Sequence, residues 1–162
     1  MALALSIVAL LATFYQLYLQ RVHNEKSVKP LIQIDLTDQN GLLYVHMQNN
    51  GLGPVILEKL VFTKDGKIYT DITQCVELNP KEYQRVTISG SVKVVPPGEY
   101  LEVFSKQFGE DISVSVIDDV RHQLADLKLT VIGRDIYDHK ITTERDLSWF
   151  ARHLPKESHN MV

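Results

Sequence analysis

The pattern of apolar and polar residues changes once, close to Pro30. Residues 2–19 form a nearly continuous apolar run, rich in Ala and Leu and without a charge, a Gly or a Pro. As a helix, these eighteen residues would cover about 27 Å, close to the roughly 30 Å of a bilayer's hydrocarbon core. After Pro30, apolar and polar residues alternate, which predicts half-buried β-strands. The pattern therefore predicts an apolar N-terminal helix followed by a mainly β body.

Turn signals divide the body into short strands, with Asn40-Gly41 and Asp65-Gly66 as the clearest hairpin turns. Residues 118–125 fit one or two helical turns, and residues 147–154 fit a short C-terminal helix. Short strands separated by turns are typical of sandwiches and barrels, and we expect an immunoglobulin-like antiparallel β-sandwich. The strands are predicted over residues 32–36, 43–47, 55–63, 85–89, 91–95, 100–104, 112–117, 127–132 and 140–143.

Charge separates the two parts of the chain. Residues 1–29 carry a net charge of +2, from Arg21, Lys26 and Lys29 against Glu25, while the remainder carries −5. Positive charge next to a membrane span stays on the cytoplasmic side, so we expect the N-terminus outside and the body in the cytoplasm. The predicted organisation is a transmembrane helix over 1–20, a basic juxtamembrane linker over 21–30, a β-sandwich over 31–154 and a flexible tail over 155–162.

Two other interpretations of the apolar run stay open. A secretory signal peptide needs a positive first region and a cleavage site of small residues, whereas only the initiator amine precedes this run and Phe14-Tyr15-Gln16 is a poor site. A buried helix of a soluble protein would also be apolar. Tyr15 and Tyr18 lie near one end of the run, where aromatic rings prefer the headgroup level, and this favours the transmembrane interpretation.

The apolar run has a stripe of small or polar residues at helical spacing. In lipid, small residues let helix backbones approach, and Ser, Thr and Gln form hydrogen bonds between helices. The stripe therefore predicts a homo-oligomer, with a polar lumen near its last two residues; the alternative is that small residues fall there by chance. The association stripe consists of Ala2, Ser6, Ala9, Thr13, Gln16 and Gln20.

Several kinds of chemistry lack support in the sequence. The net charge of −3 argues against general nucleic-acid binding, and one cysteine, Cys75, excludes an intramolecular disulfide. Gly51-Leu52-Gly53 is followed by Pro54 and a strand, so it lacks the helix that a dinucleotide-binding loop needs. The six histidines have no metal-ligand spacing. We therefore expect no enzyme activity, no catalytic residues, no metal and no cofactor.

The C-terminal third holds most of the candidate contact residues. Aromatic and basic side chains are those that stack on nucleotides and pair with phosphates, so they are candidates for binding a small anionic ligand or a protein partner. The alternatives are a core or lid position for the aromatic residues and a solvated face for the basic ones. These candidates are Arg134, Lys140, Trp149, Phe150, Arg152 and His153.

Two segments carry a resemblance to a known group of proteins. The pattern His23-Asn24-x-x-Ser27-Val28-x-Pro30 after a single span, together with 49–54 (NNGLGP) before an apolar strand, resembles small, largely uncharacterised bacterial single-span membrane proteins. The resemblance implies an inner-membrane anchor and a small cytoplasmic β-domain, and it implies no activity. In architecture alone, the chain also resembles the membrane effectors of CRISPR and cyclic-nucleotide antiphage systems.

These observations lead to two hypotheses about function. In the first, the protein is a sensor-effector in the lipid bilayer: its β-domain binds an anionic messenger such as a cyclic nucleotide, or a protein, and rearranges a helix bundle, in antiviral defence. In the second, it is a passive inner-membrane adaptor that presents an interaction domain. An envelope enzyme is a third alternative, for which the sequence shows no convergent polar site.

Overall fold

The structure is a computed structural model that describes residues 1–86, 88 and 92–154 of the chain. The N-terminal helix α1 (Ala2–Ser27) has no buried residue, and it is the one helix among the described residues that is long and apolar enough to cross a membrane. It continues through most of segment 21–30, which the sequence predicts as a linker. No helix-breaking residue occurs before Pro30, and an ion pair of 3.0 Å between Arg21 and Glu25 supports the last turns.

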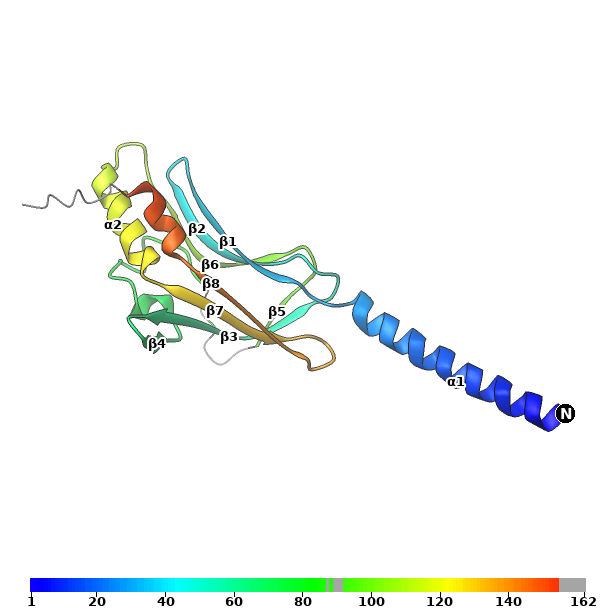
Figure 1. The fold of residues 1–162 in the computed structure, drawn as a ribbon. Coiled ribbons are helices and arrows are strands. Elements are labelled where there is room, and N and C mark those ends of the chain that lie inside the picture. Colours follow the sequence, from blue (N-terminus) through cyan, green and yellow to red (C-terminus); the bar gives the residue numbers. More distant parts are fainter. Residues whose placement is uncertain (87, 89–91, 155–162) are drawn as a thin grey trace, which may run out of the picture.

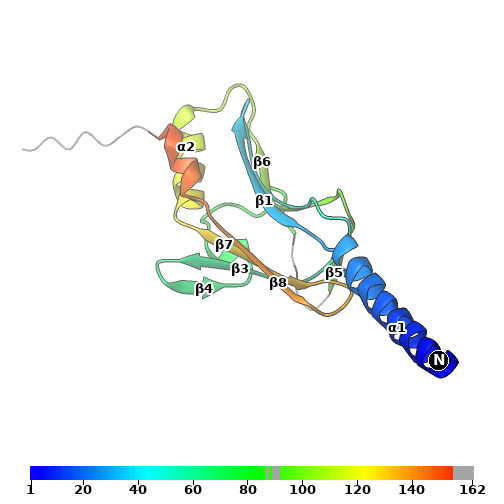
Figure 2. The same ribbon diagram turned by 45° about the vertical axis from the view of Figure 1, so that its right-hand side comes forward.

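The body consists of two antiparallel sheets, which confirms the predicted mainly β fold with an N-terminal apolar helix. Sheet A has the order β1 (Ile32–Gln39), β2 (Leu42–Asn49) and β6 (Tyr100–Gln107). Sheet B has the order β4 (Lys67–Tyr69), β3 (Val55–Lys64), β7 (Lys128–Arg134) and β8 (Lys140–Asp146), and β5 (Lys93–Val95) also pairs with β3. Figures 1 and 2 show the sheets as two layers.

The core lies between the sheets, because alternate side chains of each strand point inward. At one edge β1 and β8 meet, and Arg145 donates a hydrogen bond to the carbonyl of Ile34. The predicted hairpin turns are present, with positive φ at Asn40 (53°) and Gly41 (72°) between β1 and β2. The largest fully buried side chains include Leu43, Val45, Met47, Leu57, Phe62, Phe104, Leu129, Leu147 and Phe150.

The sandwich has two distinct ends, which we call the anchor end and the far end. The anchor end adjoins α1 and carries the β2–β3 loop and the β7–β8 turn (Figure 1). The far end carries α2 (Val114–Ala125) and the 3₁₀ helix η2 (Ser148–His153), which pack against each other. Arg121 of α2 pairs with Asp38 of β1 through two hydrogen bonds of 2.7 and 2.8 Å. A further 3₁₀ turn, η1 (Ile72–Gln74), follows β4.

Two predicted strands differ from the structure. The segment 112–117 is not a strand, because α2 begins at Val114. Its alternating apolar side chains are exposed, whereas Val120 and Leu124, one helical turn apart, are buried against the core. Over 85–89 the described residues form no strand, and the neighbouring Gln84 forms a single bridge with Ser105; Thr87 and Ser89 lie outside the described residues. The predicted tail 155–162 also lies outside the described residues.

Candidate functional site

The association stripe lies along one exposed face of α1. The hydroxyl of Ser6 donates to the carbonyl of Ala2 at 3.0 Å, and that of Thr13 donates to the carbonyl of Ala9 at 2.9 Å. Both hydroxyl donors are therefore used within the helix. Gln16 and Gln20 differ from them, because their amides make no hydrogen bond among the described residues.

A buried asparagine joins α1 to the sandwich. The side chain of Asn49, the last residue of β2, is fully buried and forms four hydrogen bonds. Its Oδ1 accepts from the backbone N–H of Leu31 at 3.2 Å and of Gly51 at 3.1 Å. Its Nδ2 donates to the carbonyls of Gly53 at 2.8 Å and Val95 at 3.1 Å. One side chain thus ties together the entry to β1, the β2–β3 loop and β5.

The backbone also packs closely where α1 meets the sandwich. We call residues 28–31, Asn49 and Gly51–Gly53 the junction. The backbone N–H groups of Leu52 and Gly53 donate to the carbonyl of Lys29 at 3.0 and 3.4 Å. A Cβ on Gly53 would lie 1.7 Å from the carbonyl oxygen of Val28, and one on Gly51 would lie 2.3 Å from the nitrogen of Leu31. Only glycine fits at either position, because the linker backbone occupies the space of a side chain.

The structure places the predicted contact residues in two separate groups. Arg134 and Lys140 are cross-strand partners at the anchor end, and Arg134 forms ion pairs with Glu58 and Asp138. The other candidates belong to η2 at the far end. Phe150 is fully buried and forms part of the core, so it has no surface to offer a ligand.

Around Phe150, the far-end candidates form a small aromatic cluster. Trp149 is half-buried and packs edge-on against Phe150, and the guanidinium carbon of Arg152 lies 3.3 Å from the Trp149 ring centroid. The side chain of His153 lies outside what the structure describes. The six predicted contact residues therefore do not form one site.

A groove of about 480 Å³ lies on the outer face of sheet A. Three aromatic rings stack in a row along it, from Tyr44 and His46 of β2 and Tyr100 of β6. The ring centroids are 3.9 Å apart between Tyr44 and His46 and 4.5 Å apart between His46 and Tyr100. Residues 81–84, which lie beside β6, also line the groove. The groove therefore offers ring edges and the outer faces of two tyrosines.

The charges in the groove do not favour an anion. Glu82 and Glu102 contribute carboxylates, and Lys81 is the one Lys or Arg among its lining residues. Burial lowers the pKa of His46; the carboxylates of Glu102 and Asp35 raise it, but the effect of burial prevails. The imidazole is thus held toward its neutral form. Such a surface suits a ligand or peptide that donates hydrogen bonds better than it suits a phosphate.

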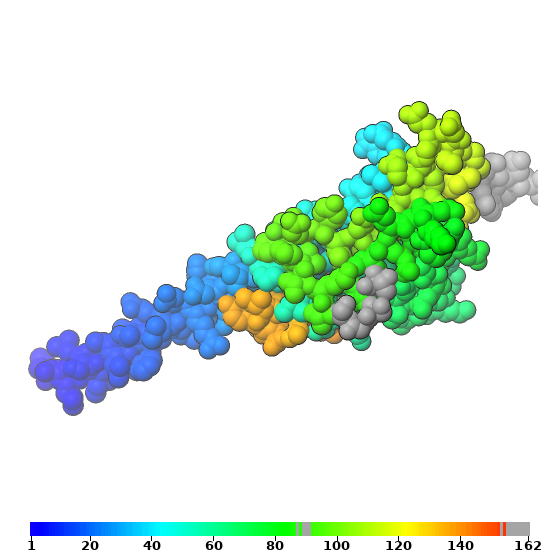
Figure 3. Space-filling model, turned by 180° about the vertical axis from the view of Figure 1, so that it is seen from behind, coloured from blue at the N-terminus to red at the C-terminus, as the bar shows by residue number. Residues whose placement is uncertain are grey.

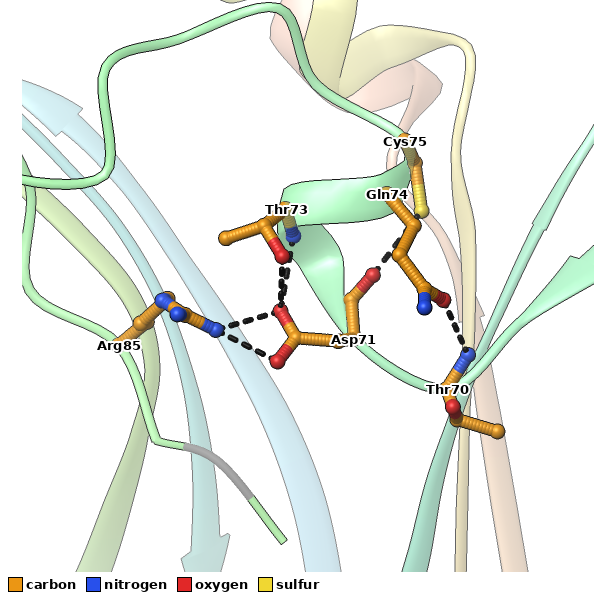
Figure 4. A network of polar contacts seen from close by, with 6 residues as sticks. All are labelled: Thr70, Asp71, Thr73, Gln74, Cys75 and Arg85. Carbon is orange, nitrogen blue, oxygen red and sulfur yellow. Dashed lines mark hydrogen bonds and ion pairs between the residues drawn. The ribbon is translucent and has the colours of Figure 1, made fainter. Parts of the chain in front are cut away.

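Figure 4 shows a second polar network, between η1 and the segment that follows it. Asp71 accepts from the N–H and hydroxyl of Thr73 at 2.9 and 2.7 Å and from Nη1 of Arg85 at 2.5 and 2.6 Å. Burial alone would raise the pKa of Asp71, but these hydrogen bonds outweigh it and lower the pKa. The Cys75 thiol donates to the carbonyl of Asp71, and burial raises its pKa to about 11. This network stabilises the fold around a neutral thiol.

Sequence reasoning missed both the function of Asn49 and the ring stack. The spacing of Tyr44 and His46 in a predicted strand places them on one face, but Tyr100 joins them only through the register of β2 and β6. Asn49 precedes a turn, which is an ordinary position for Asn, and its hydrogen bonds also involve two distant segments, at Leu31 and Val95. Among the described residues, no group of three His, Cys, Asp or Glu side chains is placed to hold a metal ion.

The structure defines a mainly β protein with one N-terminal helix that is long and apolar enough to cross a membrane. No family model and no curated protein matches the chain. Among solved structures, the chain is similar to the archaellum periplasmic stator protein FlaG from Sulfolobus acidocaldarius, with 12% identity and a TM-score of 0.30. That match covers 72% of this chain and 100% of the other. At this TM-score the similarity supports no argument about fold or function.

Proposed function

We propose that the protein is a single-span sensor-effector of the bacterial inner membrane, with its β-sandwich in the cytoplasm. A membrane span is supported by α1, whose apolar residues from Ala2 to Leu19 are all exposed to solvent in the isolated chain. Arg21, Lys26 and Lys29 directly follow the apolar run, and positive charge next to a span stays on the cytoplasmic side. The sandwich binds a ligand or a protein partner, and binding rearranges an oligomer of α1 helices.

The observation that carries this proposal is the junction. A tether that merely keeps a domain near a membrane needs no ordered connection. In this protein, the buried side chain of Asn49 accepts a hydrogen bond from the N–H of Leu31 in the linker, and Gly51 and Gly53 allow the linker backbone to pack directly against the β2–β3 loop. A rotation or tilt of the sandwich would therefore move α1 with it. A ligand shifts such an equilibrium by binding one arrangement more tightly than the other.

The stripe on α1 supports self-association as the membrane part of the mechanism. In a bilayer, the unbonded amide of Gln16 is stabilised by a partner from a neighbouring helix, and small residues at Ala9 and Thr13 allow close approach. We therefore expect a defined oligomer. Native mass spectrometry of the detergent-extracted protein tests this by comparing the wild type with Thr13→Leu/Gln16→Leu. Leu11→Ala, on the opposite side of α1, is the matched control and should leave the oligomer unchanged.

Coupling between the sandwich and α1 has its own test. A short Gly-Ser insertion between Ser27 and Val28 leaves the junction intact but separates it from the helix. Dye release from vesicles is measured with the wild type and the insertion variant, in the presence of cyclic nucleotides as candidate messengers. The proposal expects release that depends on the messenger and disappears with the insertion. If the wild type is an oligomer but no cyclic nucleotide causes dye release, the result counts against a small anionic messenger.

One observation favours a passive adaptor as the second candidate. The hydroxyls of Ser6 and Thr13 bond within their own helix, so they need no partner helix. An adaptor requires only an anchor and a binding surface, and the groove on sheet A supplies the surface. Replacing residues 1–20 with an unrelated span distinguishes the two functions, because an adaptor keeps its activity and a sensor-effector loses it.

A further inference from the structure

The turn between β7 and β8 exposes apolar side chains at its tip. It spans residues 135–139, and the exposed fractions of Ile136 and Tyr137 are 49% and 41%. A turn that only faced water would be expected to carry polar residues at its tip. The two apolar side chains therefore need an explanation in terms of what they contact.

The backbone of the turn is satisfied from within, by one buried carboxylate and its own carbonyl. Oδ1 of Asp135 accepts from the N–H of Tyr137 at 2.8 Å and of His139 at 2.9 Å. The carbonyl of Asp135 accepts from the N–H of Asp138 at 3.2 Å. Three consecutive N–H groups thus have partners inside the turn. Such a turn can enter a poorly hydrated layer without leaving these donors unpaired.

The turn lies beside the end of α1, as the ribbon and the space-filling view both show (Figures 1 and 3). Tyr137 shares a hollow of about 300 Å³ with side chains of α1 from Leu17 to Glu25. Glu25 lies about 9 Å along the helix beyond Leu19, the last residue of the apolar run. The interfacial layer on each side of a bilayer is about 5–8 Å thick. With residues 2–19 spanning the membrane, Tyr137 therefore lies beside the part of α1 that crosses the headgroup layer.

We propose that the β7–β8 turn docks into the headgroup layer of the membrane that α1 crosses. Ile136 and Tyr137 lie at the boundary with the acyl chains, where an aromatic ring with a polar end is favoured. Lys140 directly follows the turn at the start of β8, is exposed and forms no ion pair among the described residues, so its ammonium is available to lipid phosphates. The inference rests on the proposed span, but not on the oligomer or on the ligand.

Docking of this turn gives the sandwich a second attachment to the membrane, in addition to α1. Two attachments fix the tilt of the sandwich relative to the bilayer, whereas the junction alone leaves the sandwich and α1 free to tilt together. The lipid class that fits Lys140 is anionic, and the contact should weaken in neutral lipid because one charge pair is lost.

Depth-dependent quenching in lipid nanodiscs tests the docking with the full chain. In a Cys75→Ala background, an environment-sensitive fluorophore is attached to Ile136→Cys, to Lys67→Cys at the far end, or to Leu11→Cys in α1. The quenchers are lipids that carry a nitroxide near the headgroup or deep in the acyl chain. The headgroup quencher should act several-fold more strongly on the label at 136 than on the label at 67.

The three positions separate the possible failures. If the label at Leu11→Cys is quenched by the deep nitroxide and the label at 136 behaves like that at 67, the docking is overturned while the span stands. If the label at 11 is not quenched, the span itself is wrong, and the docking falls with it. Circular dichroism of each labelled protein shows whether its sandwich is folded.

A second comparison tests the lipid class. Quenching at 136 is measured in discs of phosphatidylcholine alone and in discs that also contain phosphatidylglycerol. We expect stronger quenching with the anionic lipid, and Lys140→Gln should remove the difference. Equal quenching in both lipids would overturn the contribution of Lys140. Lys59→Gln, which removes an exposed lysine of β3, is the matched control.

Discussion

The two ends of the sandwich are closed by different kinds of interaction. At the far end, α2 and η2 cover the core with apolar side chains, including Leu124, Leu147 and Phe150, all fully buried. At the anchor end, no helix of the described part of the chain covers the core. Two buried polar side chains, Asn49 and Asp135, instead hold the loops through hydrogen bonds to backbone groups. The far end is closed mainly by buried apolar area, with the Arg121–Asp38 ion pair holding α2 to β1, and the anchor end by the pairing of polar groups.

This difference has consequences for what each end can do. Closure by apolar area stabilises the whole domain and places few demands on the direction of any one contact. Closure by hydrogen bonds fixes the path of the backbone and leaves the loop side chains free to point outward. Leu52 and Ile136 are therefore exposed at the end next to α1. Closure by hydrogen bonds is therefore better suited to a surface that contacts a membrane or a partner protein.

The largest effect is expected from Phe150→Ala at the far end. Removing a fully buried phenyl ring creates a cavity and should lower the free energy of unfolding by about 3–5 kcal/mol. Urea unfolding of the detergent-solubilised chain, followed by near-UV circular dichroism, measures it. Val116→Ala on the exposed side of α2 is the control and should change stability by less than about 0.5 kcal/mol. Similar values for the two variants would contradict closure by apolar area.

Asn49→Ala should have the next largest effect, and at the opposite end. It leaves the N–H groups of Leu31 and Gly51 without their side-chain acceptor, and each buried polar group left unpaired costs about 1–3 kcal/mol. We expect a loss of about 2–4 kcal/mol in total. Hydrogen exchange should accelerate at Leu31 and Gly51 while α2 keeps its protection.

The matched control for Asn49 is its neighbour. Asn50→Ala removes only an exposed hydrogen bond to Gln33, so it should change neither stability nor exchange appreciably. If Asn49→Ala accelerates exchange equally in α2 and at the junction, the two ends are one cooperative unit, and the distinction between them fails.

The stability of the anchor end depends on pH through the carboxylate of Asp135. Burial would raise its pKa, but hydrogen bonds from His139 and Tyr137 outweigh burial and hold the pKa below the ordinary value of 3.8. The carboxylate therefore contributes stability above pH 3.8, and this contribution is lost as the pH falls through the folded-state pKa. Asp135→Asn should cost about 1–2 kcal/mol at neutral pH, because the same N–H groups then donate to a neutral amide oxygen in place of a carboxylate.

Measuring unfolding across this range tests the sign. The difference in stability between wild type and Asp135→Asn should shrink as the pH falls below 3.8. Asp138→Asn, which changes an exposed carboxylate of the same turn, gives the comparison. A difference that stays constant down to the acid limit would show that the charge of Asp135 contributes nothing.

Prediction from sequence succeeded where the signal is local. The apolar run gave α1, and Asn40-Gly41 and Asp65-Gly66 gave the two tight hairpins, because positive φ restricts the residues that fit. It failed at 112–117, where alternation fits a strand but the exposed residues merely precede the buried face of α2. The local sequence does not show whether the strand-like face at 112–117 or the helical face with Val120 and Leu124 is buried against the core.

The candidate site was harder to predict, for a related reason. Gly51 and Gly53 are needed because another backbone passes within a side chain's reach, and neither has a positive φ. The segment that passes, residues 28–31, lies 20 residues before Gly51 at Leu31 and 25 before Gly53 at Val28, so the requirement is not visible in the loop itself. Arg134 and Trp149 lie near each other in sequence but at opposite ends of the sandwich, since β8 runs from one end to the other.

The smallest effect is expected from Arg152→Ala, again at the far end. Its guanidinium lies over the Trp149 ring, and an exposed cation–π contact of this kind contributes about 0.5–1 kcal/mol. Urea unfolding measures the loss, and the fluorescence of Trp149, the single tryptophan, reports the changed environment of the ring. Arg152→Lys keeps the charge and should retain part of the contribution. Since Phe150 already closes this end, a loss as large as that of Phe150→Ala would mean that η2 depends on the cation, and that the far end, too, is closed by a polar contact.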